Sequence, residues 1–309
     1  MTFKLNIMKT NYIWLFVLGT YFLTGCDLEE LPQATTTKNE IFGTETGLNL
    51  YSNSFYNALP SGNDIVTEDY LSDINARKDR IIFLTEGAFN ANTSDTGWDW
   101  GDLRNINFFL SNNKDEAVPL QVREHYNALA KFWRAWFYYD KVKRFGDVPW
   151  INVPLDVSDP QLYEGRDPRE AVMDSVISDL NYAIAHINGN DASRTMITRD
   201  VALAFKSRIC LYEGTFRKYH SELGLTETAN AWLTEAASAA KVLMDENNYS
   251  IYTGAGAELS YRQLFTSVAP IASEIIFGRA WDVGLGLLHG ANWHYTSSTY
   301  GVQLSPIRT

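Results

Sequence analysis

Lys131-Phe-Trp-Arg-Ala-Trp-Phe-Tyr-Tyr-Asp140 carries six aromatic side chains in ten residues, and the chain continues into Arg144-Phe-Gly-Asp-Val-Pro-Trp150. Apolar residues recur at helical spacing here, which predicts a helix that opens at Pro119 and stops at Gly146. Each buried aromatic ring removes roughly 150 to 250 Å² from water, so such a helix needs neighbouring helices around it. We therefore expect this helix to form the core; the alternative is that its rings stack against a ligand.

A charged and then apolar segment opens the chain. Lys9 precedes an apolar run from Tyr12 to Leu23, which is too short to span a bilayer and is typical of a signal peptide. It ends in Leu23-Thr24-Gly25-Cys26, which resembles the bacterial lipobox, in which the cysteine is acylated. We predict a lipoprotein signal peptide over residues 1–25, with Met8 as an alternative start, and lipidation at Cys26. A membrane anchor is the alternative, but no positive cluster follows the run.

Charge and cysteine content limit the possible partners. Residues 1–25 hold two lysines and no acid, so their removal leaves 24 basic and 37 acidic residues, a net charge of −13. This balance argues against nucleic acid as a partner. Acyl chains contribute roughly 0.8 kcal/mol per buried methylene, so lipid would provide the membrane attachment. Once Cys26 is acylated only Cys210 remains, which excludes an intramolecular disulfide, and we expect Cys210 to be a small buried hydrophobe.

Further helices are predicted on both sides of the aromatic stretch. A Thr-rich tether over residues 26–44 precedes them, residues 64–88 are predicted to form a loop or a short irregular helix, and polar segments at 89–101 and 156–165 are predicted loops. Apolar spacing predicts helices at 45–59, 103–110, 167–187, 198–219 and 229–244. Small residues beside large ones in the last two permit close pairing, as in degraded tetratricopeptide repeats. From Asn248 onward, including Tyr249–Tyr252 and Glu274–Phe277, we expect loop and short strand.

Several of these motifs together resemble the SusD/RagB family of Bacteroidetes outer-membrane lipoproteins. The similarity rests on the lipobox, on Trp100–Asn107, on the aromatic helix followed by Phe145-Gly-Asp-Val-Pro149, and on Arg166 before the helix that starts near Asp167. Thr198–Glu213 and Ser273–Phe277 fit in the same order. The resemblance covers residues 26–309, and family members continue with a second half. The chain is therefore expected to be a truncated product or a fragment.

The resemblance implies a mainly α fold of tetratricopeptide-like helix pairs, a SusD-like superhelix, with a loop-rich, short-strand C-terminal part. Residues 45–309 would be the N-terminal part of this helical domain. It also implies a surface lipoprotein, anchored in the outer membrane and facing the exterior, that binds glycans or other nutrients for a SusC-like TonB-dependent transporter, without catalysis, cofactor or metal. Asp27, Glu29 and Glu30 after the lipidated cysteine resemble a surface-export signal, and a solvated linker is the alternative.

Loop residues are the candidate ligand-binding groups, because sugars bind to aromatic faces and to a few Asp, Asn and Arg side chains. Trp98 is the first candidate, flanked by Asp95 and Asp99, whereas Trp100 is expected to dock the start of the next helix. Trp98 is expected to have no such packing partner. A second group lies near the C-terminus, and weaker candidates precede Trp98; these are Asn292, Trp293 and Tyr295, and Asp69, Tyr70 and Asn75.

Two other classes of function stay open. A helical-repeat adaptor would bind a peptide between its helices, and a glycoside hydrolase needs only two carboxylates about 5 to 10 Å apart. The sequence has no Gly-x-Ser-x-Gly, no phosphate-binding glycine loop and no His-Glu-x-x-His, which argues against catalysis. His289 and His294 lack a third ligand nearby in the sequence, so no metal site is predicted.

Overall fold

The computed structural model describes residues 37–64, 75–76, 86, 97–297 and 305–306. The chain divides into two compact units, Met1–Lys38 and Asn39–Thr309, and almost all of the first lies outside the described residues. The predictions for Cys26, Asp69, Tyr70 and Asp95 also fall outside them. Across the described segments, we find no helix with both the length and the apolar character that a membrane crossing requires.

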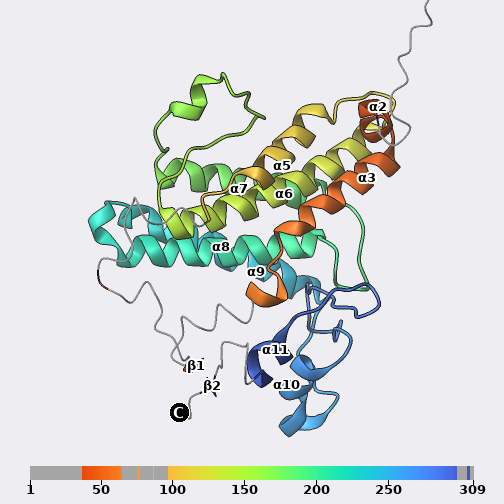
Figure 1. The fold of residues 1–309 in the computed structure, drawn as a ribbon. Helices are drawn as coiled ribbons and strands as arrows, with labels where there is room; N and C mark the ends of the chain where they lie inside the picture. The colour runs from red at the N-terminus through yellow and green to blue at the C-terminus, as the bar shows by residue number, and fades with distance from the viewer. Residues whose placement is uncertain (1–36, 65–74, 77–85, 87–96, 298–304, 307–309) are drawn as a thin grey trace, which may run out of the picture. The chain divides into compact units, whose positions relative to one another are not determined.

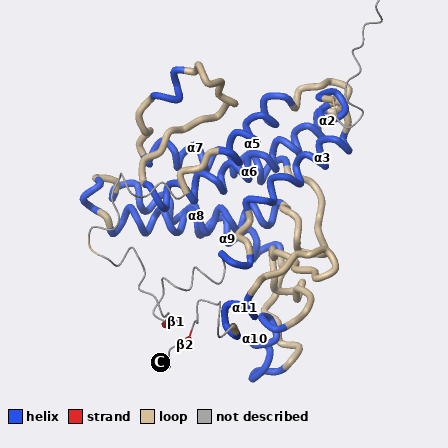
Figure 2. Tube along the Cα trace, in the orientation of Figure 1, coloured by secondary structure: helices blue, strands red, loops and turns tan. Residues whose placement is uncertain are grey.

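The described part of the second unit is mainly helical, as predicted (Figures 1 and 2). Short 3₁₀ turns, η2, η5 and η6, connect some of the helices at Ser54–Ala58, Pro160–Tyr163 and Ser221–Leu223. The α-helices are α2 (Lys38–Phe42), α3 (Glu45–Asn53), α5 (Gly101–Asn112), α6 (Leu120–Phe145), α7 (Arg169–His186), α8 (Arg199–Tyr219), α9 (Thr226–Glu246), α10 (Gly256–Thr266) and α11 (Ala291–Thr296).

The aromatic stretch forms α6, a helix of 26 residues that follows Pro119. Gly146 ends it with a φ of +70°, a conformation that favours glycine. Phe132, Trp133 and Tyr138 are fully buried, so the prediction that this helix forms the core is confirmed. The short helix α2 lies inside the range predicted as a tether.

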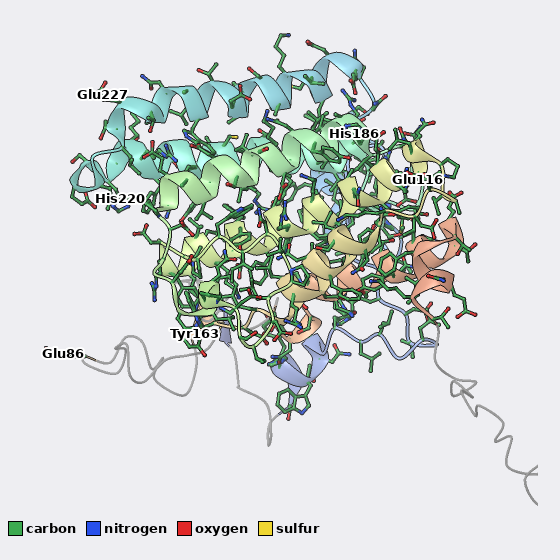
Figure 3. All side chains as sticks on the ribbon, turned by 90° about the horizontal axis from the view of Figure 1, so that it is seen from above. Glu86, Glu116, Tyr163, His186, His220 and Glu227 are labelled. Carbon is green, nitrogen blue, oxygen red and sulfur yellow. The ribbon has the colours of Figure 1, made fainter. Side chains whose placement is uncertain are left out.

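Neighbouring helices pack in pairs along the chain. Helix α6 lies against α5 and α7, and α8 lies against α7 and α9. Gly214 on α8 allows a close approach, because a Cβ atom there would lie 2.8 Å from the Leu233 side chain on α9. Figure 3 shows His220 and Glu227 at the end of the bundle where η6 connects these two helices. Small residues thus permit the close pairing that the sequence predicted.

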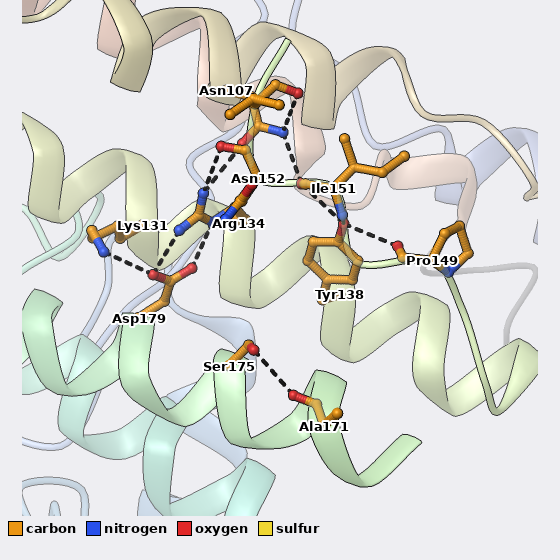
Figure 4. Close-up of polar contacts among 11 residues, drawn as sticks. Asn107, Lys131, Arg134, Tyr138, Pro149, Ile151, Asn152, Ala171, Ser175 and Asp179 are labelled. Carbon is orange, nitrogen blue, oxygen red and sulfur yellow. Dashed lines mark hydrogen bonds and ion pairs between the residues drawn. The ribbon is translucent and has the colours of Figure 1, made fainter. Parts of the chain in front are cut away.

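Two buried ionic clusters tie the helices together. Between α6 and α7, Nε and Nη2 of Arg134 donate to the Asp179 carboxylate at 2.6 and 2.9 Å, and the Lys131 ammonium donates to it at 3.0 Å (Figure 4). The second cluster joins α7 to α8, where Glu213 is 0% exposed and accepts from both Arg169 and Arg217. Loss of one partner from such a cluster leaves a buried charge uncompensated, which is strongly destabilising.

The segment Phe145-Gly-Asp-Val-Pro149 connects the end of α6 to the start of α7. The Asp147 carboxylate accepts from the Arg169 backbone N–H at 2.8 Å and so caps α7. Asp167 lies much closer to α7 in the sequence, but its carboxylate accepts from the Trp150 N–H at 2.7 Å and does not cap the helix. The side chain that caps α7 therefore comes from a residue more than twenty positions upstream, and not from the residues directly before the helix.

The region after α9 differs from the prediction. Tyr249–Tyr252 and Glu274–Phe277 are not strands; one backbone hydrogen bond, from Ser250 N–H to the Ser273 carbonyl at 2.7 Å, links the two segments. Two short helices, α10 and α11, form there instead. Among the described residues, strand pairing is limited to β1 (Asn75–Ala76) with β2 (Ser305–Pro306), which are antiparallel.

Candidate functional site

A cleft of about 750 Å³ lies along one side of α6. Its lining comes from four places in the chain: the middle and end of α6, the first turn of α5, the segment 57–64 around the end of η2, and α8. The residues of α6 that face it include Trp136, Tyr139 and Lys143. The helix predicted as core therefore buries most of its rings and presents others to an opening.

Aromatic rings form part of the cleft surface. The rings of Trp136 and Phe205 are stacked with 4.8 Å between centroids and an interplanar angle of 24°. Tyr139 meets Phe205 edge to face at 5.7 Å. Trp136 and Tyr139 are only half-buried, so part of each ring is accessible, while packing against α8 fixes their orientation. Such fixed rings suit a ligand with apolar faces.

Burial raises the pKa of the Tyr139 hydroxyl to about 12, and the neighbouring Tyr212 adds to this shift. The hydroxyl is therefore protonated at neutral pH and can donate a hydrogen bond. It makes no hydrogen bond to any residue in the described part of the chain. Arg208, which also lines the cleft, likewise forms no hydrogen bond or ion pair with a described residue. Both groups have donor capacity left for a ligand.

Charged side chains of both signs surround the rings. The four cations are Lys141, Lys143, Arg144 and Arg208, and the four carboxylates are Asp64, Asp99, Asp102 and Asp140. Lys141 donates to the Gly97 carbonyl at 2.6 Å, and its burial lowers its pKa. Lys143 lies 3.3 Å from Asp140. The cleft therefore combines aromatic surface with hydrogen-bonding groups.

Trp98 does not line this cleft, although its neighbour Asp99 does. Its ring packs edge to face on Trp100 at 5.1 Å and on Phe145 at 4.8 Å, and the Arg166 guanidinium lies 4.8 Å from its centroid. The expectation that Trp98 has no packing partner is therefore wrong, because α6 ends directly beside it. A ligand-binding role for Trp98 stays a prediction.

Asp99, a member of the first candidate group, and its neighbour Trp100 have structural roles at the start of α5. Asp99 accepts from the Gly101 backbone N–H at 2.8 Å at the start of α5. Trp100 contacts Phe137 at 5.5 Å and so docks the beginning of the helix, as the sequence predicted. Asp95 lies outside the described residues.

The second candidate group is on α11 and is exposed. Trp293 is 50% and Tyr295 43% accessible, and Asn292 is exposed beside them. Between them His294 is buried, with Nε2 at 2.8 Å from Asn63 Oδ1, which holds α11 to the segment 57–64 that lines the cleft. No ring contact, hydrogen bond or ion pair in the described part of the chain joins this group to Trp98 or Asp99, and a ligand-binding role for this group stays a prediction.

The sequence pointed to Trp136 and Tyr139 only in the alternative that rings of the aromatic helix stack against a ligand, and it did not single out Arg208. The sequence did contain a signal: the aromatic residues of α6 occupy more faces of the helix than a single buried stripe requires. Asn75, a weaker candidate, lies on β1 and is not among the residues that line the cleft. No group of three or more His, Cys, Asp or Glu side chains placed to hold a metal ion occurs among the described residues.

Comparison with known proteins identifies proteins of similar sequence and of similar fold. No family model matches the chain. SusD-like protein P2 of Formosa agariphila is 26% identical over 231 residues, which cover 67% of this chain and 44% of that protein. A SusD-like protein from Bacteroides fragilis has a TM-score of 0.58 at 19% identity, covering 82% of this chain and 49% of the other.

A SusD-like carbohydrate-binding protein from the same species has a TM-score of 0.57 at 17% identity, covering 77% and 46% of the two chains. The chain thus spans about half the length of the relatives that it matches. These structures share its helical fold. By sequence the chain is similar to SusD-like proteins, and by fold it is similar to their solved structures.

Proposed function

We propose that this chain is the N-terminal part of a non-catalytic surface lipoprotein that binds glycans. The observation that supports the proposal is the cleft beside α6, where the stacked Trp136 and Phe205 rings adjoin the Tyr139 hydroxyl and Arg208, which lack partners among the described residues. A sugar ring would lie against the aromatic surface with its C–H face, and its hydroxyl groups would exchange hydrogen bonds with the polar groups around it.

The anchoring and the partner belong to the same proposal. The lipobox at Cys26 supports attachment to the outer membrane by lipid, with the protein facing the exterior. Similarity to SusD-like proteins supports delivery of the bound nutrient to a SusC-like TonB-dependent transporter. The relative named as a carbohydrate-binding protein supports a glycan as the nutrient. Chemical cross-linking of outer membranes followed by mass spectrometry should join this chain to such a transporter.

Glycan binding is tested with an oligosaccharide array, followed by titration calorimetry of each hit. We expect Trp136→Leu to weaken binding roughly fivefold or more, since a stacked ring is typically worth about 1 kcal/mol or more. Tyr163→Ala serves as the control, because Tyr163 is 83% exposed and lies in the loop between α6 and α7, outside the cleft lining. Tyr163 is labelled in Figure 3.

The same assay separates the candidate sites. Trp98→Leu and Trp293→Leu, measured in parallel, show whether either predicted group contributes to binding. If Trp136→Leu binds as the unmodified protein does and Trp293→Leu does not, the site is on α11 and the cleft assignment is wrong. Shortening of a bound oligosaccharide during the titration would favour the glycoside hydrolase alternative instead.

A further inference from the structure

The cleft differs in charge from the rest of the protein. The whole chain has 26 basic and 37 acidic residues, a net charge of −11, whereas basic and acidic side chains are equal in number around the cleft. The cleft is therefore formally neutral, whereas the chain as a whole is acidic. An anionic ligand meets less repulsion at the cleft than the net charge of the chain would impose elsewhere.

The cations of the cleft differ in how they are engaged. Lys141 is buried and held by the Gly97 carbonyl, close enough to Asp99 and Asp102 for both carboxylates to raise its pKa. Arg208, by contrast, is exposed and forms no hydrogen bond or ion pair with a described residue. Its guanidinium is therefore available to form paired hydrogen bonds with a planar or tetrahedral anion.

Tyr139 lies between two of the cations. The Lys143 ammonium is 4.8 Å from the centroid of its ring, and Arg208 is near enough to its hydroxyl to lower its pKa, against the larger effect of burial. Asp140 is the carboxylate closest to this group, and it pairs with Lys143 at 3.3 Å with both side chains exposed. An exposed pair of this kind contributes little and leaves Lys143 available to a stronger anion.

We propose that the cleft selects acidic glycans, with Arg208, Lys143 and the Tyr139 hydroxyl binding a carboxylate or sulfate group on a sugar that stacks against Trp136. This inference rests on the proposed glycan-binding function and adds the class of sugar. Arg208, Lys143 and Tyr139 all line the cleft beside the stacked Trp136 and Phe205 rings, and the Lys143 ammonium lies 4.8 Å from the centroid of the Tyr139 ring. A charged substituent at the edge of a stacked ring would lie within their reach.

Calorimetry with matched oligosaccharides tests the charge preference. The probes are an oligogalacturonate and its methyl ester, and a sulfated galactan oligosaccharide and its desulfated form. We expect one charged member to bind roughly 10- to 100-fold more tightly than its neutral partner, because hydrogen bonds between charged groups are stronger than neutral ones. Comparison of the two pairs distinguishes carboxylate from sulfate as the preferred group.

Arg208→Gln should weaken binding of the charged probe far more than binding of its neutral partner, and so remove most of that preference. Arg166→Gln is the matched control, since Arg166 is exposed and lies outside the cleft lining. Equal binding of charged and neutral probes would overturn the inference while glycan binding stands. Equal loss in both variants would show general electrostatic attraction and also overturn it. Absence of binding to all probes and to the array would refute the proposed function itself.

Discussion

The helical body formed by α5 to α9 differs from the region that follows it, residues 248–297, in how far its apolar side chains are buried. In the body, large apolar residues such as Phe109 and Leu180 are 0% exposed and buried charges are paired. In the later region Phe265 is 73% and Leu285 75% exposed. The two regions therefore differ in how they are held: extensive core packing in the first, and in the second polar contacts together with the packing of Ile276 and Phe277 against the core.

The contacts of the later region come mostly from single side chains. Arg194 donates to the Ala272 carbonyl at 2.8 Å, and Arg279 donates to the Leu59 carbonyl at 2.9 Å. Each such bond contributes roughly 1 kcal/mol, far less than the burial of a helix face. The comparison indicates that global stability resides in the helical body and that residues 248–297 open locally. The following predictions test it, from the largest expected effect to the smallest.

Removal of the carboxylate at the centre of the α7–α8 cluster should have the largest effect. Glu213→Ala leaves the Arg169 and Arg217 guanidinium groups buried without their anion, and we expect a loss of about 3 to 5 kcal/mol in the free energy of unfolding. Urea denaturation followed by circular dichroism measures it. Asp245→Ala, which breaks the exposed pair with Lys241, should cause no measurable change. A small effect for Glu213→Ala would mean that the body is not held by this cluster.

Replacement of leucine by alanine should lower the free energy of unfolding by different amounts in the two regions. Leu180→Ala removes a fully buried side chain from α7 and should cost about 2 to 5 kcal/mol, whereas Leu285→Ala should change stability by less than about 0.5 kcal/mol. Both are measured by the same denaturation experiment. Comparable costs would show that residues 248–297 belong to the cooperative core, and the comparison between the regions would fail.

Arg194→Met should open the later region without unfolding the body. The guanidinium of Arg194 lies 4.8 Å from the Tyr249 ring and donates to the Ala272 carbonyl, so it joins two parts of this region. We expect amide exchange over residues 249–278 to accelerate about tenfold, equivalent to roughly 1.4 kcal/mol, with α6 to α8 unaffected. Hydrogen–deuterium exchange mass spectrometry gives both values. Faster exchange in α6 as well would indicate that the two regions unfold together.

The thiol of Cys210 reports on the body with the smallest perturbation. Burial raises its pKa to about 12 from an ordinary value near 9. In a Cys26→Ser variant, we expect no reaction with a thiol reagent at pH 8 until denaturant unfolds α8. Because the folded-state pKa is the higher one, the associated stability is present below pH 9 and falls between pH 9 and 12. Rapid labelling of the native protein would contradict this burial.

The helices could be predicted because their signals are local. Pro119 before α6, Gly146 after it and apolar residues at helical spacing act within a few turns, and together with Phe145-Gly-Asp-Val-Pro149 they also indicated the family. The burial of Cys210 followed from its position among large apolar residues of one predicted helix. The strands expected at Tyr249–Tyr252 and Glu274–Phe277 do not form. A strand needs a partner elsewhere in the chain, and the local sequence does not specify one.

The sequence by itself determined the helices, their core-forming faces and the family, because these depend on residues three or four positions apart. Only the tertiary structure decided which side chains meet across long separations. Arg134 pairs with Asp179 45 positions later, Trp98 packs on the end of α6, and the cleft joins Tyr139 to Arg208 on another helix. Such contacts depend on how the helices cross, and helix crossing is set by the packing of whole faces, not by any local pattern.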